Sequence, residues 1–220
     1  MTARGVCQVC IASVGTLSNI CQAVKEGISC YCRPIMEILI ATLQNHTVER
    51  EIKPHVLVTF SDIALAMGPA FGEYLSVVAS ILKAAVDLSV NGGGAIDEAF
   101  REFNVELRRS ILEAFSGILQ GIGRTEAEKY LHGDSQYMID FLECVVSEAP
   151  RDEMITSTAV GLLGDIAHSL PSLTTMMQEK KWIEVFVRDC LRHASQSVKD
   201  SGKWAAAAIA NAEKTTATSA

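Results

Sequence analysis

Five histidines, the side chains most often used for acid–base chemistry near neutral pH, are scattered along the chain. None belongs to an HExxH zinc motif, and no GxSxG turn supplies a serine nucleophile. The run Asn91-Gly92-Gly93-Gly94 lacks the Lys-Ser/Thr pair of a phosphate loop. His168 follows Asp165 by one helical turn, a spacing more typical of a surface pair than of a catalytic dyad. Because catalysis needs converging groups, the sequence predicts no catalytic residues and no enzyme.

Seven cysteines include a CxxC pair, Cys7 and Cys10, and a CxC pair, Cys30 and Cys32. A structural zinc site would need two such pairs, or one pair with histidines, presented by turns. Cys7 and Cys10 lie in a helical pattern with no histidine nearby, so we expect neither a metal nor another cofactor. The odd count and the apolar neighbours are typical of buried, reduced thiols in an intracellular protein.

The chain is acidic, with a formal net charge of −7, and 49% of its residues are hydrophobic. Lys and Arg are not clustered, which argues against nucleic acid as a partner. An acidic surface favours basic partners, although many intracellular proteins carry such a charge. No unbroken apolar run approaches the roughly 20 residues of a membrane span, and no signal peptide is evident. We therefore expect no membrane partner.

Residues 34–68 are the clearest structural unit of the sequence. They predict two amphipathic helices joined by a turn at residues 44–47. Pro34 suits the first turn of the first helix, and Gly68-Pro69 ends the second. Neither helix can bury its apolar face alone, so the pair needs neighbours of the same kind.

The second helix of this pair belongs to a repeat. Four stretches carry an apolar residue at their first, fifth and ninth positions and a small residue after the ninth, namely residues 6–20, 52–66, 107–121 and 155–169. A fifth copy could begin at Val198, and the intervals are about 50 residues. The partner helices are expected at residues 34–45, 71–90, 135–147 and 171–193. This period predicts an all-α fold of the HEAT/armadillo type, a right-handed superhelix of antiparallel helix pairs.

The repeat predicts one array over residues 1–214, with about four to five repeats, and a disordered tail over residues 215–220. Loops are expected at residues 91–94 and 124–134. The first copy has no partner helix before it and is apolar, which suggests a fragment of a longer array. The alternative is a capping helix at residues 1–24.

A second regularity marks the start of the repeated helices. An acid or amide is followed four residues later by a base at Glu49 and Lys53 and at Asn104 and Arg108, whereas Asp152 has no such base. The acid or amide could cap the helix or lie in its first turn. The pair resembles the D-x-x-V-R pattern of HEAT repeats, in which the two side chains form a ladder between repeats.

Several segments look like the carboxyl-terminal HEAT repeats of the importin-β (karyopherin-β) family. They include IMEILIATLQN, VEREIKPHVLVTFSDIALAMG, NVELRRSILEAFSGILQGI and the closing KWAAAAIANAEK. The resemblance covers almost the whole chain and is strongest at residues 35–68 and 107–122. The triplet Ile52-Lys53-Pro54 makes it more specific than a generic HEAT match. The end departs from the family, because Ala205-Ala206-Ala207-Ala208 stands where a basic helix is common.

The resemblance implies a nuclear transport receptor of the cytoplasm, the nucleus and the nuclear pore. Its implied partners are importin-α, through that protein's basic importin-β-binding segment, or basic nuclear-localisation cargo. Phe-Gly nucleoporins would dock between outer helices, and the Ran GTPase would bind mainly to repeats missing here. A HEAT scaffold or adaptor subunit without a transport role is the alternative, because the repeat pattern alone fits both.

The resemblance also implies binding residues. Trp204 matches the tryptophan of the family's last inner helix, which would stack on an arginine of the ligand; packing at the last repeat interface is the alternative. Acids of the inner helices would form a negative groove, namely Asp62, Asp165, Glu106, Glu113 and Asp200. Asp62 and Asp165 share one repeat position and could instead serve hydrogen bonds between repeats. Each acid alone could also be a solvated surface charge.

Overall fold

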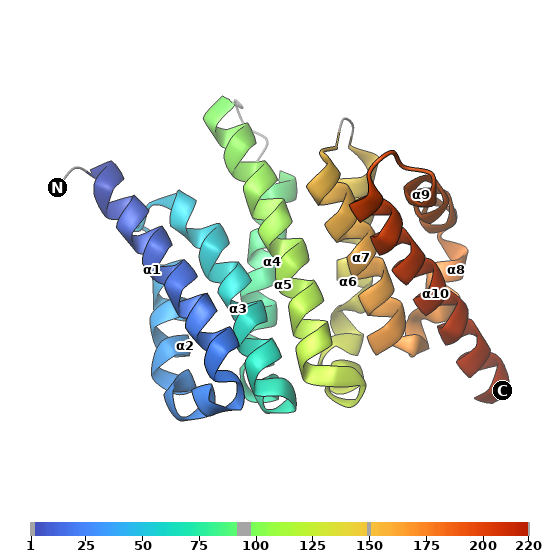
Figure 1. Ribbon diagram of the computed structural model, residues 1–220, viewed down its shortest axis with the longest axis horizontal. Coiled ribbons are helices and arrows are strands. Elements are labelled where there is room, and N and C mark those ends of the chain that lie inside the picture. The colour runs from blue at the N-terminus through green and yellow to red at the C-terminus, as the bar shows by residue number, and fades with distance from the viewer. Residues whose placement is uncertain (1–2, 92–97, 149–150, 220) are drawn as a thin grey trace. The chain divides into compact units, whose positions relative to one another are not determined.

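The computed structural model describes residues 3–91, 98–148 and 151–219, and all the regular secondary structure in this part of the chain is helical (Figure 1). The all-α prediction is confirmed. The chain divides into two compact units, Met1–Ile122 (unit 1) and Gly123–Ala220 (unit 2). Residues 92–94 of the expected glycine loop lie outside the described residues. The single array over residues 1–214 stays a prediction.

Unit 1 consists of two helical layers. Helices α1, α3 and the first part of α5 form one layer, and α2 and α4 form the other (Figure 1). Short 3-10 segments connect several of them. The elements are α1 (Ala3–Val24), η1 (Lys25–Ile28), α2 (Ser29–Gln44), η2 (Arg50–Ile52), α3 (Lys53–Met67), η3 (Gly68–Tyr74), α4 (Leu75–Asn91) and α5 (Glu98–Leu131).

The boundaries of the predicted helix pair are partly confirmed. Helix α3 ends at Met67, and Gly68 follows it with a φ of 62°, a conformation that glycine adopts without strain. Pro34, however, lies inside α2, which begins at Ser29, so the prediction that it starts the helix is wrong. The apolar face explains the earlier start, because Cys32 is as buried as Met36 one turn later.

The core of unit 1 is centred on α3. Val56, Phe60 and Ile63 are fully buried because α3 lies between neighbours on both sides. Helix α5 approaches α3 most closely at two glycines of α5. A Cβ added to Gly117 would lie 2.4 Å from the Cβ of Ser61, and one added to Gly121 would lie 2.5 Å from the carbonyl carbon of Ala64. Small residues therefore set the distance between these two helices.

Unit 2 begins where Gly123, with a φ of 74°, interrupts α5. Residues 124–134, expected to be a loop, are instead helical through Leu131 and continue as η4 (His132–Asp134). Ala127 and Leu131 are buried one turn apart, so a short apolar stripe holds this polar segment as a helix. The other elements are α6 (Ser135–Ser147), α7 (Glu153–Ser169), η5 (Pro171–Leu173), α8 (Thr174–Glu179), α9 (Lys181–Leu191) and α10 (Gln196–Ser219).

The last predicted outer helix, residues 171–193, is divided into η5, α8 and α9. Lys180 separates α8 from α9 with non-helical dihedral angles, and its Nζ lies 3.1 Å from Glu143 and 3.4 Å from Asp140 on α6. These ion pairs connect the break between α8 and α9 to α6. Helix α10 extends to Ser219, past residue 215, where the sequence predicts a disordered tail.

Two helical stretches in the described part of the chain, Gly5–Gln44 and Arg50–Asn91, are long and apolar enough to cross a membrane by length and composition alone. The sequence predicts no such stretch, so that prediction is wrong on these criteria. Lys25 in the first stretch and Gly68 in the second have positive φ and interrupt the helix. Helix α1 packs on α3, and α3 carries much of the core of unit 1.

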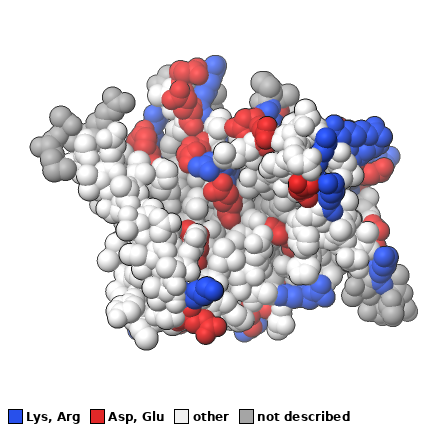
Figure 2. All heavy atoms as spheres, in the orientation of Figure 1, with Lys and Arg blue, Asp and Glu red and all other residues white. Residues whose placement is uncertain are grey.

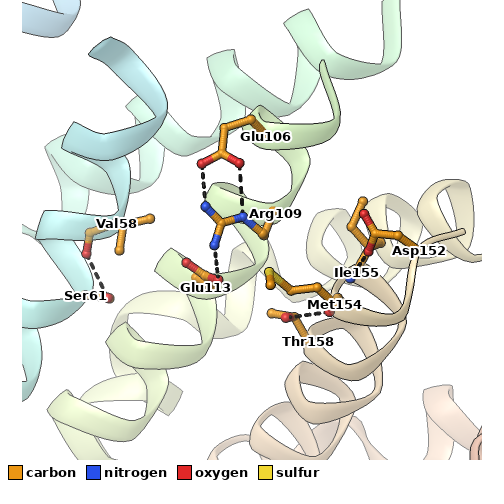
Figure 3. Close-up of polar contacts among 9 residues, drawn as sticks. All are labelled: Val58, Ser61, Glu106, Arg109, Glu113, Asp152, Met154, Ile155 and Thr158. Atoms are coloured by element: carbon orange, nitrogen blue, oxygen red, sulfur yellow. Dashed lines mark hydrogen bonds and ion pairs between the residues drawn. The ribbon is translucent and has the colours of Figure 1, made fainter. Parts of the chain in front are cut away.

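A side-chain cap fixes the start of α7 in unit 2. The Asp152 carboxylate accepts a 2.6 Å hydrogen bond from the backbone N–H of Ile155 (Figure 3). Replacing Asp152 with Ala should lower the free energy of unfolding by about 1 kcal/mol, because that N–H loses its partner. Urea denaturation measures the change. Asp152→Asn keeps an acceptor oxygen and should cost less; equal losses for the two variants would contradict a capping role.

Candidate functional site

Two of the predicted groove acids, Glu106 and Glu113, lie on α5 in unit 1 and flank Arg109 (Figure 3). The Arg109 guanidinium donates to both carboxylate oxygens of Glu106, with Nε 3.1 Å from Oε2, and its Nη1 donates to Oε1 of Glu113 over 3.0 Å. The three residues follow i, i+3 and i+7 spacing, which places them on one helix face. Arg109 was not among the site residues predicted from the sequence, although its position between the two acids is the signal for this pairing.

The charge balance of this cluster depends on Arg109. Burial raises the pKa of Glu113, the Arg109 charge acts in the opposite direction, and the charges of Glu106 and Asp62 add to the increase. The hydrogen bond to Glu106 is the main cause of a raised pKa for Arg109. Two carboxylates and one guanidinium leave the cluster with a net negative charge. Figure 2 shows acidic side chains on the surface over α5 in unit 1, whereas α1 has no charged residue from Gly5 to Val24.

Asp62 points toward a neighbouring helix. Only 7% of the residue is exposed, and its Oδ1 accepts a 2.8 Å hydrogen bond from Nε2 of Gln22 on α1. This is a hydrogen bond between repeats, which sequence analysis left open as the alternative to a ligand contact. The same alternative describes Asp165 in unit 2, where Oδ1 accepts from Nε1 of Trp204 at 3.2 Å.

Trp204 on α10 is both a packing residue and a surface residue. It is 42% exposed, yet its indole packs on α7 so closely that a Cβ added to Gly164 would lie 2.5 Å from the ring. The imidazole of His168 lies beside it, with ring centroids 5.6 Å apart. Unit 2 thus brings together two predicted site residues, Asp165 and Trp204, and adds Gly164 and His168.

Asp200, the fifth predicted acid, is exposed on α10. Its carboxylate accepts hydrogen bonds from Lys203 at 2.8 Å and from Gln196 at 2.9 Å. The bond from Lys203 is the main cause of a lowered pKa for Asp200. Because Asp200 and both of its partners are exposed side chains of α10, Asp200 can still contact a ligand.

Three of the residues proposed for the ladder donate hydrogen bonds to the end of the preceding helix in unit 1. Lys53 donates to the carbonyl of Leu43, at the end of α2, over 3.1 Å. Arg108 and Asn104 both donate to the carbonyl of Ser89, at the end of α4, also over 3.1 Å. These bonds satisfy carbonyls that a helix terminus leaves without partners. A ladder between repeats stays a prediction for Glu49, Lys53, Asn104, Arg108 and Asp152.

Unit 2 repeats this arrangement with a residue that sequence analysis missed. Arg151 precedes α7 and donates to the carbonyls of Val146, in the last turn of α6, and of Glu148, the first residue after α6. A base therefore contacts the end of the preceding outer helix in three cases. Lys53 and Arg151 lie at or just before the start of α3 and α7, whereas Arg108 lies well inside α5, which begins at Glu98. For Arg151 the signal in the sequence was a basic residue just before the first turn of the helix.

A hollow of about 500 Å³ lies on unit 1 beside α1. It is lined by Val6, Cys7, Cys10, Val14, Thr42, Thr47, Val48, Glu49 and Ile52. Burial, followed by the charges of Glu51 and Glu49, raises the pKa of Cys7, so its thiol is a weak nucleophile at neutral pH. In the described part of the chain, no group of three or more His, Cys, Asp or Glu side chains could hold a metal ion.

Residues 3–191 match the family described as "Importin subunit beta-1-like, TPR repeats". Importin subunit beta-1 of Arabidopsis thaliana is 34% identical over 206 residues, which are 93% of this chain and 24% of the relative. Kap95p, the yeast importin-β, has a similar fold in two solved structures. One, described by the effect of Kap95p binding on the switch loops of RanGDP, has 25% identity and a TM-score of 0.81 over 93% of this chain and 24% of that one. The other, a complex of Kap95p with Nup1, has 24% identity and a TM-score of 0.80 over the same shares.

The chain spans about a quarter of the length of the relatives that it matches. The match to the family covers both units, from α1 to the end of α9. It thus includes the acidic cluster of α5 and the residues of α7 that contact Trp204. On this evidence, the chain belongs to the importin subunit beta-1-like family.

Proposed function

We propose that this chain is the carboxyl-terminal repeat region of a nuclear transport receptor that acts in protein import into the nucleus. The family match over residues 3–191 is the observation that carries the proposal. It implies a protein that moves between the cytoplasm and the nucleus through the nuclear pore. A receptor of this kind binds and releases other proteins, so its helices need to supply binding surfaces and not catalytic groups.

The ligand that suits the described surfaces is basic, either the importin-β-binding segment of importin-α or a nuclear-localisation cargo. Glu106, Glu113 and Asp200 remain partly or fully accessible, and Trp204 offers an aromatic surface for a cation. Asp62 and Asp165 are buried and bonded to neighbouring helices, so we assign them to the support of the surface and not to ligand contact.

Two further partners are proposed because solved structures of a similar protein name them. Kap95p is described in solved structures with RanGDP and with Nup1. We propose that the whole receptor binds Ran, mainly through repeats beyond this chain, and that it binds Phe-Gly nucleoporins between outer helices.

A salt-dependent binding experiment tests the basic ligand. The chain should bind a fluorescent peptide that carries the basic importin-β-binding segment of importin-α, and the dissociation constant should rise between about 50 and 200 mM salt, because exposed ion pairs are screened. The double variant Glu106→Gln/Glu113→Gln should weaken binding by roughly threefold or more, in line with about 0.5–1 kcal/mol for a partly exposed ion pair.

A matched pair of acids away from the inner helices provides the control. Glu26 and Glu37 are exposed on η1 and α2, so Glu26→Gln/Glu37→Gln changes the net charge equally and should leave the affinity nearly unchanged. Equal weakening by both double variants would indicate a general charge effect. Absence of binding even at low salt would favour the scaffold or adaptor alternative.

A further inference from the structure

The indole of Trp204 packs on a surface of α7 in unit 2 that is formed by Gly164, Asp165 and His168 and is called the seat below. Gly164 leaves the space for the ring, because a Cβ there would lie 2.5 Å from both Cδ1 and Nε1 of the indole. One residue later in the helix, Asp165 accepts the indole N–H at 3.2 Å. One turn further on, His168 places its ring 5.6 Å from that of Trp204, at an angle of 52°. Three residues of a single helix thus fix one side chain of another.

We propose that Gly164 and Asp165 are positioning residues that hold Trp204 as a receptor for a guanidinium or ammonium group of the ligand. The inference rests on the proposed function, in which Trp204 already contacts the cation, and deepens it by assigning the position of the indole to Gly164 and Asp165. Asp165 is only 3% exposed, whereas Trp204 is 42% exposed. The carboxylate therefore acts through the tryptophan.

The seat has two physical consequences for cation binding. The indole is ordered when the chain folds, so a ligand does not have to supply the entropy of ordering it. The buried carboxylate also adds negative potential beside the ring, and a cation is attracted by that potential and by the ring face together. Both effects require the hydrogen bond from Nε1 and the absence of a side chain at residue 164.

Unit 1 has a related arrangement without an aromatic residue. Asp62 occupies the repeat position of Asp165 and accepts from the amide of Gln22. The aspartate at this position therefore joins neighbouring inner helices in both units, and only in unit 2 is its partner an aromatic ring. This difference singles out the Asp165 position for a role beyond helix packing.

The seat can be tested by the fluorescence of Trp204 in the 220-residue chain. A Trp182→Phe background leaves Trp204 as the sole tryptophan. Gly164→Ala should displace the indole, and Asp165→Leu should remove its acceptor; both should shift the emission to longer wavelength and increase quenching by acrylamide. Asp165→Asn retains an acceptor oxygen and should keep the emission of the parent. Gly161→Ala, on the same helix with nothing within 4 Å of the added Cβ, should also keep it.

A planar cation, N-methylpyridinium, then reports on cation binding without any peptide. It should quench the parent more strongly than neutral acrylamide does, and Gly164→Ala and Asp165→Leu should reduce this preference at least twofold while circular dichroism confirms that the variants remain helical. The basic peptide should bind these two variants at least threefold more weakly than it binds the parent. Asp165→Asn should lower the affinity for the basic peptide less than Asp165→Leu does.

The two hypotheses fail differently. If the parent shows the pyridinium preference and the predicted fluorescence shifts but binds no basic peptide, the proposed transport function fails and the positioning role stands. If Gly164→Ala and Asp165→Leu leave the emission and the pyridinium preference unchanged, the positioning role is wrong. It is also wrong if Asp165→Asn weakens binding of the peptide as much as Asp165→Leu does while its emission stays that of the parent, because the charge of the acid, and not the position of the indole, would then determine the affinity.

Discussion

Replacing Gly121 with Ala is expected to destabilise unit 1 by about 1–3 kcal/mol or more, the cost of overpacking a close-packed interior. The added Cβ would lie 2.5 Å from the carbonyl carbon and oxygen of Ala64 and 2.7 Å from the backbone nitrogen of Leu65. These are backbone atoms of α3, so no rotation of a side chain relieves the contact. Alanine inside a helix normally gains about 0.5–1 kcal/mol over glycine, and here the collision exceeds that gain.

Gly15 provides the matched control for this prediction. It lies in α1, also in unit 1, and an added Cβ there meets no atom within 4 Å. Gly15→Ala should therefore raise the free energy of unfolding by up to about 1 kcal/mol through helix propensity alone. Urea denaturation of both variants measures the two effects. Similar free energies of unfolding for Gly121→Ala and Gly15→Ala would contradict the prediction. They would mean that α3 and α5 can move apart without loss of stability.

The inner helices were predictable because their pattern reports burial directly. The first, fifth and ninth positions of the repeat are buried in three helices, namely Ile52, Val56 and Phe60, Leu107, Ile111 and Phe115, and Ile155, Ala159 and Leu163. In α1, the same positions, Val6, Cys10 and Val14, line the hollow instead. Identical spacing therefore predicts the helix, whereas burial also depends on which helix packs against it.

The direction of the buried acids could not be predicted in the same way. The partners of Asp62 and Asp165 lie about 40 residues away in sequence, in another repeat, and depend on the register between helices. Periodicity defines the face of one helix and contains no information on that register. The partner of Glu106 and Glu113 was different, because Arg109 is local and the i, i+3 and i, i+4 rules identify it.

Arg109 makes the acidic cluster a partly neutralised surface, and its removal should change ligand affinity. In the free chain, Arg109 occupies the carboxylates of Glu106 and Glu113 that a basic ligand would use. Arg109→Gln should therefore strengthen binding of the basic importin-α peptide at low salt by about 0.5–1 kcal/mol, or roughly two- to fivefold. The peptide titration described above measures this gain, which should shrink as salt is added.

The matched control removes an arginine from an exposed pair on an outer helix. Arg33 pairs with Glu37 on α2 at 3.3 Å, so Arg33→Gln makes the same change of charge away from the proposed surface. It should alter peptide affinity much less than Arg109→Gln. Equal gains for the two variants would indicate that the overall net charge, and not the α5 cluster, controls binding.

The pKa of Glu113 gives an independent test of the same substitution. Burial already raises this pKa, and Arg109 opposes the increase, so Arg109→Gln should raise it further. Carbon-detected NMR titration of the carboxyl group measures the change. Only the ionised carboxylate attracts a cation, so the affinity gained by Arg109→Gln should decrease as the pH falls through the raised pKa. A pKa of Glu113 that is unchanged or lowered in the variant would mean that Arg109 does not neutralise this acid, and the predicted gain in affinity would lose its physical basis.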